Sequence, residues 1–191
     1  ACGNEVVVTR DREADFLQCK QPERCITARL GELEHFAKVV DIQGFGPKVV
    51  RKCFDQGFLS TPVDYYRLRV EDLEQLERLG RKSAQGLIDE VEAHREIPLS
   101  TFLQALGIAH LGGQTSRLLA QELGSLRAIR EVDRERLLQI RGIQDAIADA
   151  IIEGLDTHAE LIDALLSEVK IDETPVETIG NRLGEGGDGL L

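Results

Sequence analysis

The chain has 191 residues and a formal net charge of −11; 42% of its residues are apolar, 4% are aromatic, and it contains no Trp or Met. A core must therefore be built from Leu, Ile, Val and Ala, which favours small and closely packed helices. The acidic charge argues against a general polyanion-binding protein, because nucleic-acid binding normally needs a basic surface that releases counterions. The sequence shows neither a membrane-spanning apolar run nor a secretory signal, so we expect no membrane partner and a cytoplasmic location.

Residues 1–27 form a segment rich in cysteine, which we expect to be a small separate module. Two short apolar runs in it have the pattern of strands joined by a charged turn, and three cysteines flank them: Cys2, Cys19 and Cys25. Cysteine knuckles on a small hairpin are typical of a zinc ribbon, in which the metal closes a module that lacks a core of its own. The site is one ligand short, and a Cys-x-x-Cys spacing puts the missing cysteine just before Ala1, so we expect weak zinc occupancy. The alternative is three unrelated thiols.

From residue 28 to residue 170 apolar residues recur at helical spacing, and four short glycine-containing turns interrupt the periodicity. We expect these turns near residues 43–47, 79–83, 111–115 and 141–145. Their glycines, Gly44, Gly80, Gly112 and Gly142, lie 36, 32 and 30 residues apart. Four helix–turn–helix units at so regular a period indicate a repeat. The predicted fold class is therefore mostly α, with tandem helical units preceded by a small cysteine-rich β module.

The first turn, Asp41-Ile-Gln-Gly-Phe-Gly-Pro-Lys48, carries the clearest signal for a binding site. Gly44 and Gly46 permit positive φ and close approach of a ligand, and Pro47 suits the first turn of a helix. The free N–H groups at that helix N-terminus can hold a phosphate without any positive side chain. A plain connection between two helices would use the same residues, and the repetition of the turn is what favours the binding site.

Four stretches are similar to the C-terminal half of bacterial NAD-dependent DNA ligase, in which a four-Cys zinc finger leads into four helix-hairpin-helix motifs. They are Cys19-Lys-Gln-Pro-Glu-Arg-Cys25, Asp41 to Lys48, Leu79-Gly-Arg-Lys-Ser-Ala84 and Phe102-Leu-Gln-Ala-Leu-Gly-Ile-Ala-His110, and the similarity runs from residue 1 to about residue 170. The resemblance implies binding of nicked double-stranded DNA without sequence preference, during replication and repair.

The same resemblance implies which parts of such a ligase lie outside this chain. The adenylation domain, with its NAD pocket and nucleotide-accepting lysine, would lie upstream, so NAD would act only there and this chain alone would be non-catalytic. Residues 171–191, which are rich in glycine, would be a flexible linker toward a further C-terminal domain.

The turns and the resemblance together predict the residues that contact DNA. Backbone contacts are expected from Gly44, Phe45, Gly46, Gly80, Gly112, Gly113 and Gly142. Side chains close to the turns would assist them: Lys48, Arg51, Lys52, Arg81, Lys82, His110, Arg117 and Arg141. Only the first turn keeps both glycines of a Gly-x-Gly, whereas the later position holds Lys82, Gln114 and Gln144 in the following three. The first turn therefore ranks highest and the fourth lowest.

Two other classes of function fit the same pattern. The chain could be a repair or recombination scaffold that uses helix-hairpin-helix units outside any ligase, or a protein-binding helical repeat, which the acidic charge favours. An independent enzyme fits poorly, because the four histidines are scattered over helical segments and show no catalytic or metal-binding spacing. We expect the chain to be monomeric.

Overall fold

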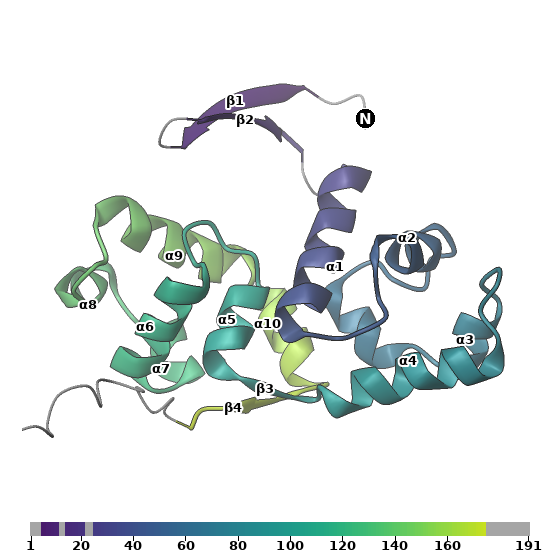
Figure 1. The fold of residues 1–191 in the computed structure, drawn as a ribbon. Helices are drawn as coiled ribbons and strands as arrows, with labels where there is room; N and C mark the ends of the chain where they lie inside the picture. The colour runs from purple at the N-terminus through teal and green to yellow at the C-terminus, as the bar shows by residue number, and fades with distance from the viewer. Residues whose placement is uncertain (1–4, 12–13, 22–24, 175–191) are drawn as a thin grey trace, which may run out of the picture.

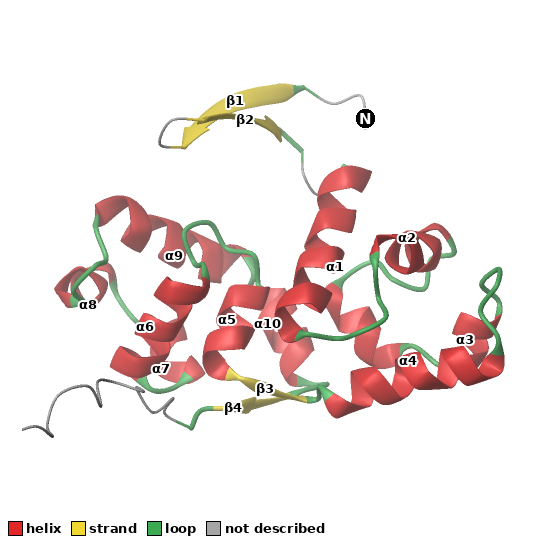
Figure 2. Cartoon of the chain, viewed as in Figure 1, coloured by secondary structure: helices red, strands yellow, loops and turns green. Residues whose placement is uncertain are grey.

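The computed structural model describes residues 5–11, 14–21 and 25–174, and most of these residues lie in helices (Figures 1 and 2). The predicted mostly helical fold is confirmed for this part of the chain. None of the helices within the described ranges is long and apolar enough to cross a membrane.

A β-hairpin stands apart from the other elements in Figure 1 and leads to the first helix, α1 (Ile26–Val40). In the hairpin, β1 (Val6–Asp11) pairs antiparallel with β2 (Ala14–Cys19). The two strands predicted for this segment are therefore confirmed. Cys2 and residues 175–191 of the expected linker lie outside the described residues, so the structure does not test what was predicted for them.

The helical body continues from α1 with ten further segments. In chain order they are α2 (Pro47–Asp55), the 3-10 helix η2 (Pro62–Arg67), α3 (Val70–Glu74), α4 (Arg81–Ala93), α5 (Leu99–Ala105), α6 (Gly113–Leu123), α7 (Leu126–Arg130), α8 (Arg134–Gln139), α9 (Asp145–Thr157) and α10 (Ala159–Leu166). Helix α1 packs on α2 and α5, and α6 packs on α5. In Figure 1, α2 to α4 lie on one side of α1 and α5, and α6 to α9 lie on the other.

The core is one cluster of buried apolar side chains that extends from α1 to the residues after α10. As the composition predicts, most of its members are Leu, Ile, Val and Ala. A small aromatic group lies where α1 meets η2: the Tyr65 ring stacks on Phe36 and meets Phe45 edge-on, with centroids 6.1 and 5.1 Å apart. The Tyr65 hydroxyl donates to the Leu33 carbonyl at 3.0 Å, so its burial leaves no unpaired polar atom.

The C-terminal part of the described chain ties the two sides of the body together. Helix α10 contacts both η2 and α9. Strand β4 (Lys170–Asp172) pairs parallel with β3 (Glu96–Pro98), which lies between α4 and α5 in the sequence. Beside this pair the Arg95 guanidinium donates to the carbonyls of Tyr66 at 2.9 Å and Glu168 at 2.8 Å. The folded body thus extends two residues past the boundary expected at residue 170.

Candidate nucleic-acid interface

Four turns of the helical body, each joining two helices, share one backbone geometry. In each, one residue adopts a left-handed conformation with φ between 62° and 104°: Gly44, Arg78, His110 and Gly142. Two residues later the backbone is extended and caps the next helix, at Gly46, Gly80, Gly112 and Gln144. The left-handed residues follow one another at intervals of 34, 32 and 32 residues, a more even period than that of the glycines chosen from the sequence.

Each turn is anchored to the core on both sides of its N-cap. Before the N-cap an apolar side chain packs inward: Phe45, Leu79, Leu111 and Ile143. Four residues after the N-cap, a fully buried residue donates its N–H to the N-cap carbonyl at 2.9 or 3.0 Å: Val50, Ala84, Ser116 and Ala148. The one hydroxyl in this set, that of Ser116, donates to the Leu111 carbonyl at 3.2 Å. The core therefore fixes the turn backbone and leaves its outer side to solvent.

The structure corrects the positions of the second and third turns. Helix α4 begins at Arg81 and α6 begins at Gly113, so the predicted ranges 79–83 and 111–115 already include the first residues of these helices. Two residues that had been assigned to the later glycine position therefore lie in the first helical turn instead: Lys82 and Gln114.

In the second and third turns the glycines cap helices and do not take the left-handed position. Gly80 and Gly112 are N-caps and correspond to Gly46, whereas the left-handed positions before them hold Arg78 and His110. A glycine normally marks a left-handed position, and because two larger residues occupy it here, the sequence does not reveal the register of these turns. Arg78 thus occupies a turn position equivalent to Gly44, which the sequence did not mark and which only the equivalent turns of the structure bring out.

The helices that follow the four turns share a further property. Within the described residues, α2, α4, α6 and α9 have no side-chain N-cap. Helices α1, α5 and α10 have no side-chain cap either, whereas α7 and α8 are capped. At α7 the Ser125 hydroxyl accepts from the Ala128 N–H at 3.1 Å, and at α8 the Asp133 carboxylate accepts from the Arg136 N–H at 2.7 Å. The first turns of α2, α4 and α6 also contain no acidic residue. Three helix N-termini therefore present N–H donors and a positive dipole end at the surface, which suits an anion.

The fourth turn has the same backbone but a different charge. Asp145 is the first residue of α9, and Arg134 from α8 pairs with it at 2.5 Å and with Asp149 at 2.6 Å. The hydrogen bond from Arg134 holds the pKa of the Asp149 carboxyl below its usual range. A carboxylate at a helix N-terminus interacts with the positive end of the helix dipole in place of a phosphate, and it also repels the phosphate. The predicted contact at Gly142 therefore lies in a turn whose charge disfavours it.

Some of the basic residues expected to assist are engaged within the protein. Arg51 pairs with Asp55 at 2.8 Å, and the Lys52 ammonium donates to the Glu77 carbonyl at 2.7 Å, which links α2 to the second turn. Both side chains thus have a structural role that the sequence alone did not indicate.

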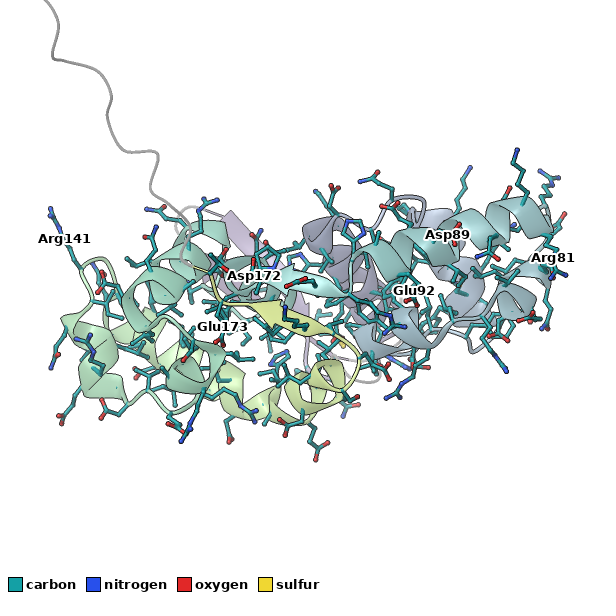
Figure 3. All side chains as sticks on the ribbon, turned by 90° about the horizontal axis from the view of Figure 1, so that it is seen from below. Arg81, Asp89, Glu92, Arg141, Asp172 and Glu173 are labelled. Carbon is teal, nitrogen blue, oxygen red and sulfur yellow. The ribbon has the colours of Figure 1, made fainter. Side chains whose placement is uncertain are left out.

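Other basic residues are exposed and make no ion pair or hydrogen bond with the described part of the chain: Lys48, Lys82, Arg117 and Arg141. Arg81 makes one long ion pair within the described residues, with its guanidinium 3.9 Å from the Glu74 carboxylate. Figure 3 shows Arg81 and Arg141 pointing into solvent at opposite ends of the body. The positive side chains near the turns are therefore spread along the molecule.

The first turn is also a packing contact with the second hairpin. A Cβ added to Gly44 would lie 2.5 Å from Cδ2 of Leu87 on α4, and the Gln43 N–H donates to the Glu90 carboxylate at 3.1 Å. The φ of 87° favours glycine at position 44, and a Cβ there would have to displace the end of the Leu87 side chain. At Gly46 a Cβ would meet nothing within 4 Å, and the turn borders a pocket of about 360 Å³.

The cysteines are only partly within the described chain, and Cys2 lies outside it. Cys19 ends β2 and is partly buried, and Cys25 is buried at the N-cap of α1. Across residues 5–11, 14–21 and 25–174, no group of three or more His, Cys, Asp or Glu side chains is arranged to hold a metal ion. The zinc site therefore stays a prediction. Cys53, by contrast, is fully buried in the core, and burial raises the pKa of its thiol to about 11.

Three of the four histidines have ring nitrogens 2.7 to 2.9 Å from backbone carbonyl oxygens: His35, His94 and His158. These contacts fit the packing roles that were expected for them. His110 differs from them because it is exposed on the third turn.

Comparison with known families agrees with this geometry. Residues 36–93 match the SAM-like helix-hairpin-helix tandem, and residues 101–162 match the helix-hairpin-helix motif. The first match contains the first two of the turns described above, and the second match contains the other two. The body is therefore a helix-hairpin-helix structure.

Among curated proteins, the chain is similar to DNA ligases. It is 41% identical to the DNA ligase of Salinibacter ruber over 152 residues, which are 78% of this chain and 22% of that protein. It is 37% identical to the DNA ligase of Haloarcula marismortui over 191 residues, or 96% of this chain and 27% of that protein. For the DNA ligase of Syntrophobacter fumaroxidans the identity is 34% over 171 residues, 87% of this chain and 25% of that protein. The chain thus spans about a quarter of the length of these relatives.

Proposed function

We propose that this chain is the DNA-holding region of an NAD-dependent DNA ligase and binds double-stranded DNA at a nick without reading its sequence. One observation carries the proposal: three equivalent turns, each with a left-handed residue two positions before the N-cap, present helix N-termini that have no side-chain cap and no acidic residue in the first turn. The similarity to proteins named DNA ligase over most of the chain supports the ligase context.

Phosphate contacts of this kind explain how a chain with a net charge of −11 can bind a polyanion. Main-chain N–H groups at a helix N-terminus bind phosphate without a basic side chain, and phosphates carry no sequence information. The hairpins occur as two successive pairs, in residues 36–93 and 101–162. Each pair can take phosphates from the two strands of one duplex, which suits a protein that must hold both sides of a nick.

The remaining parts of the proposal follow from the resemblance to the ligase family. The chain alone would not catalyse nick sealing, because the NAD-binding adenylation domain would lie elsewhere in the protein. Zinc would be structural: thiols of Cys19 and Cys25, at the two ends of the connection between β2 and α1, suit zinc chemically, with Cys2 as a third ligand. We also propose that the protein is cytoplasmic and that the chain is monomeric.

The test is to introduce a carboxylate side chain at the N-caps of α2, α4 and α6, which have no side-chain cap. In Gly46→Asp, Gly80→Asp and Gly112→Asp the new side chain enters open space, at N-cap positions where aspartate is favoured. The fold should be as stable as before, because the aspartate accepts the first-turn N–H groups. The affinity for a fluorescently labelled nicked duplex should fall at least tenfold in the triple variant, because those donors are then occupied and phosphate is repelled.

A matched control adds the same charge elsewhere. Gly86→Asp places an aspartate within α4, again in open space and on the helix that already carries Asp89 and Glu92 (Figure 3). This variant should bind nicked DNA like the parent chain. If the triple N-cap variant keeps full affinity, or if Gly86→Asp loses as much per added charge, the helix N-termini do not hold the phosphates.

A further inference from the structure

A groove of about 550 Å³ lies where three elements of the second half of the body meet. Apolar side chains line it from α7, α10 and β4: Leu126, Leu166 and Ile171. Among the described residues after Ile26, Leu166 is the one large apolar side chain that is exposed, at 38%. An exposed apolar side chain in a groove of this size marks a place that another apolar group can cover.

The arginines of the groove already have partners within the protein. They form two ion pairs, Arg127 with Glu131 at 3.0 Å and Arg130 with Asp163 at 2.7 Å. A bound ion would have to compete with these carboxylates for the guanidinium groups. The groove therefore suits an apolar occupant better than a charged one.

The chain itself reaches the groove at the C-terminal end of its described part. Glu173, the residue after β4, lines the groove, and its carboxylate accepts from the Leu126 N–H at 2.8 Å. This hydrogen bond holds the end of β4 beside α7 (Figure 1). The residues that follow Thr174 therefore start at the rim of the groove, and five extended residues span at most about 17 Å, so the groove lies within their reach.

The sequence after Thr174 supplies apolar residues at this distance. Val176 and Ile179 are three positions apart, a spacing that puts both side chains on the same side of one helical turn. From Gly180 onward glycine is frequent, and glycine has no side chain to fill a groove. A segment tethered at the rim also has an effective concentration in the millimolar range, so it occupies the groove ahead of a similar segment from another molecule.

We propose that this groove is the docking site for residues 175–179 of the same chain, in which Val176 and Ile179 cover Leu166 and Ile171. Docking here fixes the direction in which the chain continues after β4, along α7. The inference does not depend on DNA binding, because no residue that lines the groove belongs to the four turns.

A single tryptophan reports the docking, because the sequence contains none. In the 191-residue chain, acrylamide should quench the indole of Ile179→Trp about threefold less than that of Leu190→Trp, since the first indole is covered by the groove. Adding Leu166→Ser to Ile179→Trp should raise the quenching to the level of Leu190→Trp. Adding Val8→Ser instead removes a 64% exposed apolar side chain of β1, far from the groove, and should leave the quenching unchanged.

Methyl nuclear Overhauser contacts in the unsubstituted chain decide the question, because they do not depend on whether an indole fits the groove. Contacts from Val176 or Ile179 to Leu166 are expected within one chain. Their absence overturns the inference whatever the tryptophan variants show. Contacts that appear only between differently labelled chains overturn it as well, because the groove would then hold a second copy of the chain.

Discussion

At the scale of single residues, glycines of the same hairpin pair have opposite consequences for stability. Gly44→Ala introduces a Cβ at φ 87° and against Leu87, which should lower the free energy of unfolding by about 2–4 kcal/mol. Gly86→Ala makes the same chemical change on the exposed side of α4 and should raise it by about 0.5–1 kcal/mol. Urea unfolding of both variants measures the two changes in the free energy of unfolding. A neutral Gly44→Ala would mean that the first turn does not pack on α4 as described.

The two tyrosines, Tyr65 and Tyr66, predict how stability depends on alkaline pH. Both are buried, and burial raises the pKa of each phenol well above its ordinary value near 10. The folded state then keeps protons that the unfolded state loses, so the stabilisation is complete below pH 10. Above the ordinary pKa it is lost, by about 1.4 kcal/mol per pH unit for each tyrosine.

An absorbance titration at the phenolate band follows the ionisation of Tyr65 and Tyr66 directly, because they are the only two tyrosines in the sequence. Neither should ionise in the folded protein near pH 10, and both should ionise together with alkaline unfolding. A reversible titration of either phenol near pH 10, with the helical circular dichroism unchanged, contradicts the burial described here.

At the scale of elements, the four turns share one backbone geometry but differ in the charge at the helix N-terminus that follows. Asp145, held by Arg134, already places a carboxylate at the N-terminus of α9. Gln144→Asp, at the N-cap of the same helix, should therefore change the affinity for nicked DNA less than twofold, whereas Gly46→Asp or Gly80→Asp alone should each lower it at least threefold. Anisotropy titrations of the three variants decide this. A loss in Gln144→Asp as large as in the other two would place DNA on the fourth hairpin as well.

The sequence supported the helices and the existence of the four turns, because helical periodicity and glycine are local signals. It misplaced the register of the second and third turns, since Arg78 and His110 adopt the left-handed backbone that a glycine would have marked. It also missed the pairing of β4 with β3, because three residues pair with a segment 74 positions earlier and carry no periodicity of their own. The charge pattern that separates the fourth hairpin depends on Arg134, whose partners only the folded structure brings together.

At the scale of the whole molecule, Arg95 joins parts of the chain that are distant in sequence. Its guanidinium donates to the carbonyls of Tyr66 and Glu168 and lies over the Tyr66 ring, 5.5 Å from the centroid. Arg95→Ala leaves two carbonyls without this donor and should lower the free energy of unfolding by about 1.5–3 kcal/mol. Arg127→Ala, which removes an exposed pair with Glu131, should cost about 0.5 kcal/mol or less. Equal effects in urea unfolding would mean that β4 and α10 are not tied to the first half through Arg95.

The central claim is that this acidic chain holds duplex DNA through phosphates, and the salt dependence of binding tests it most directly. The measurement is the affinity of the 191-residue chain for a labelled nicked duplex, as a function of salt concentration and for two unrelated base sequences. The account predicts binding at low salt, an affinity that falls at least about tenfold between about 50 and 200 mM salt, and the same affinity for both sequences. Absence of binding at low salt, or binding that salt does not weaken, would contradict it.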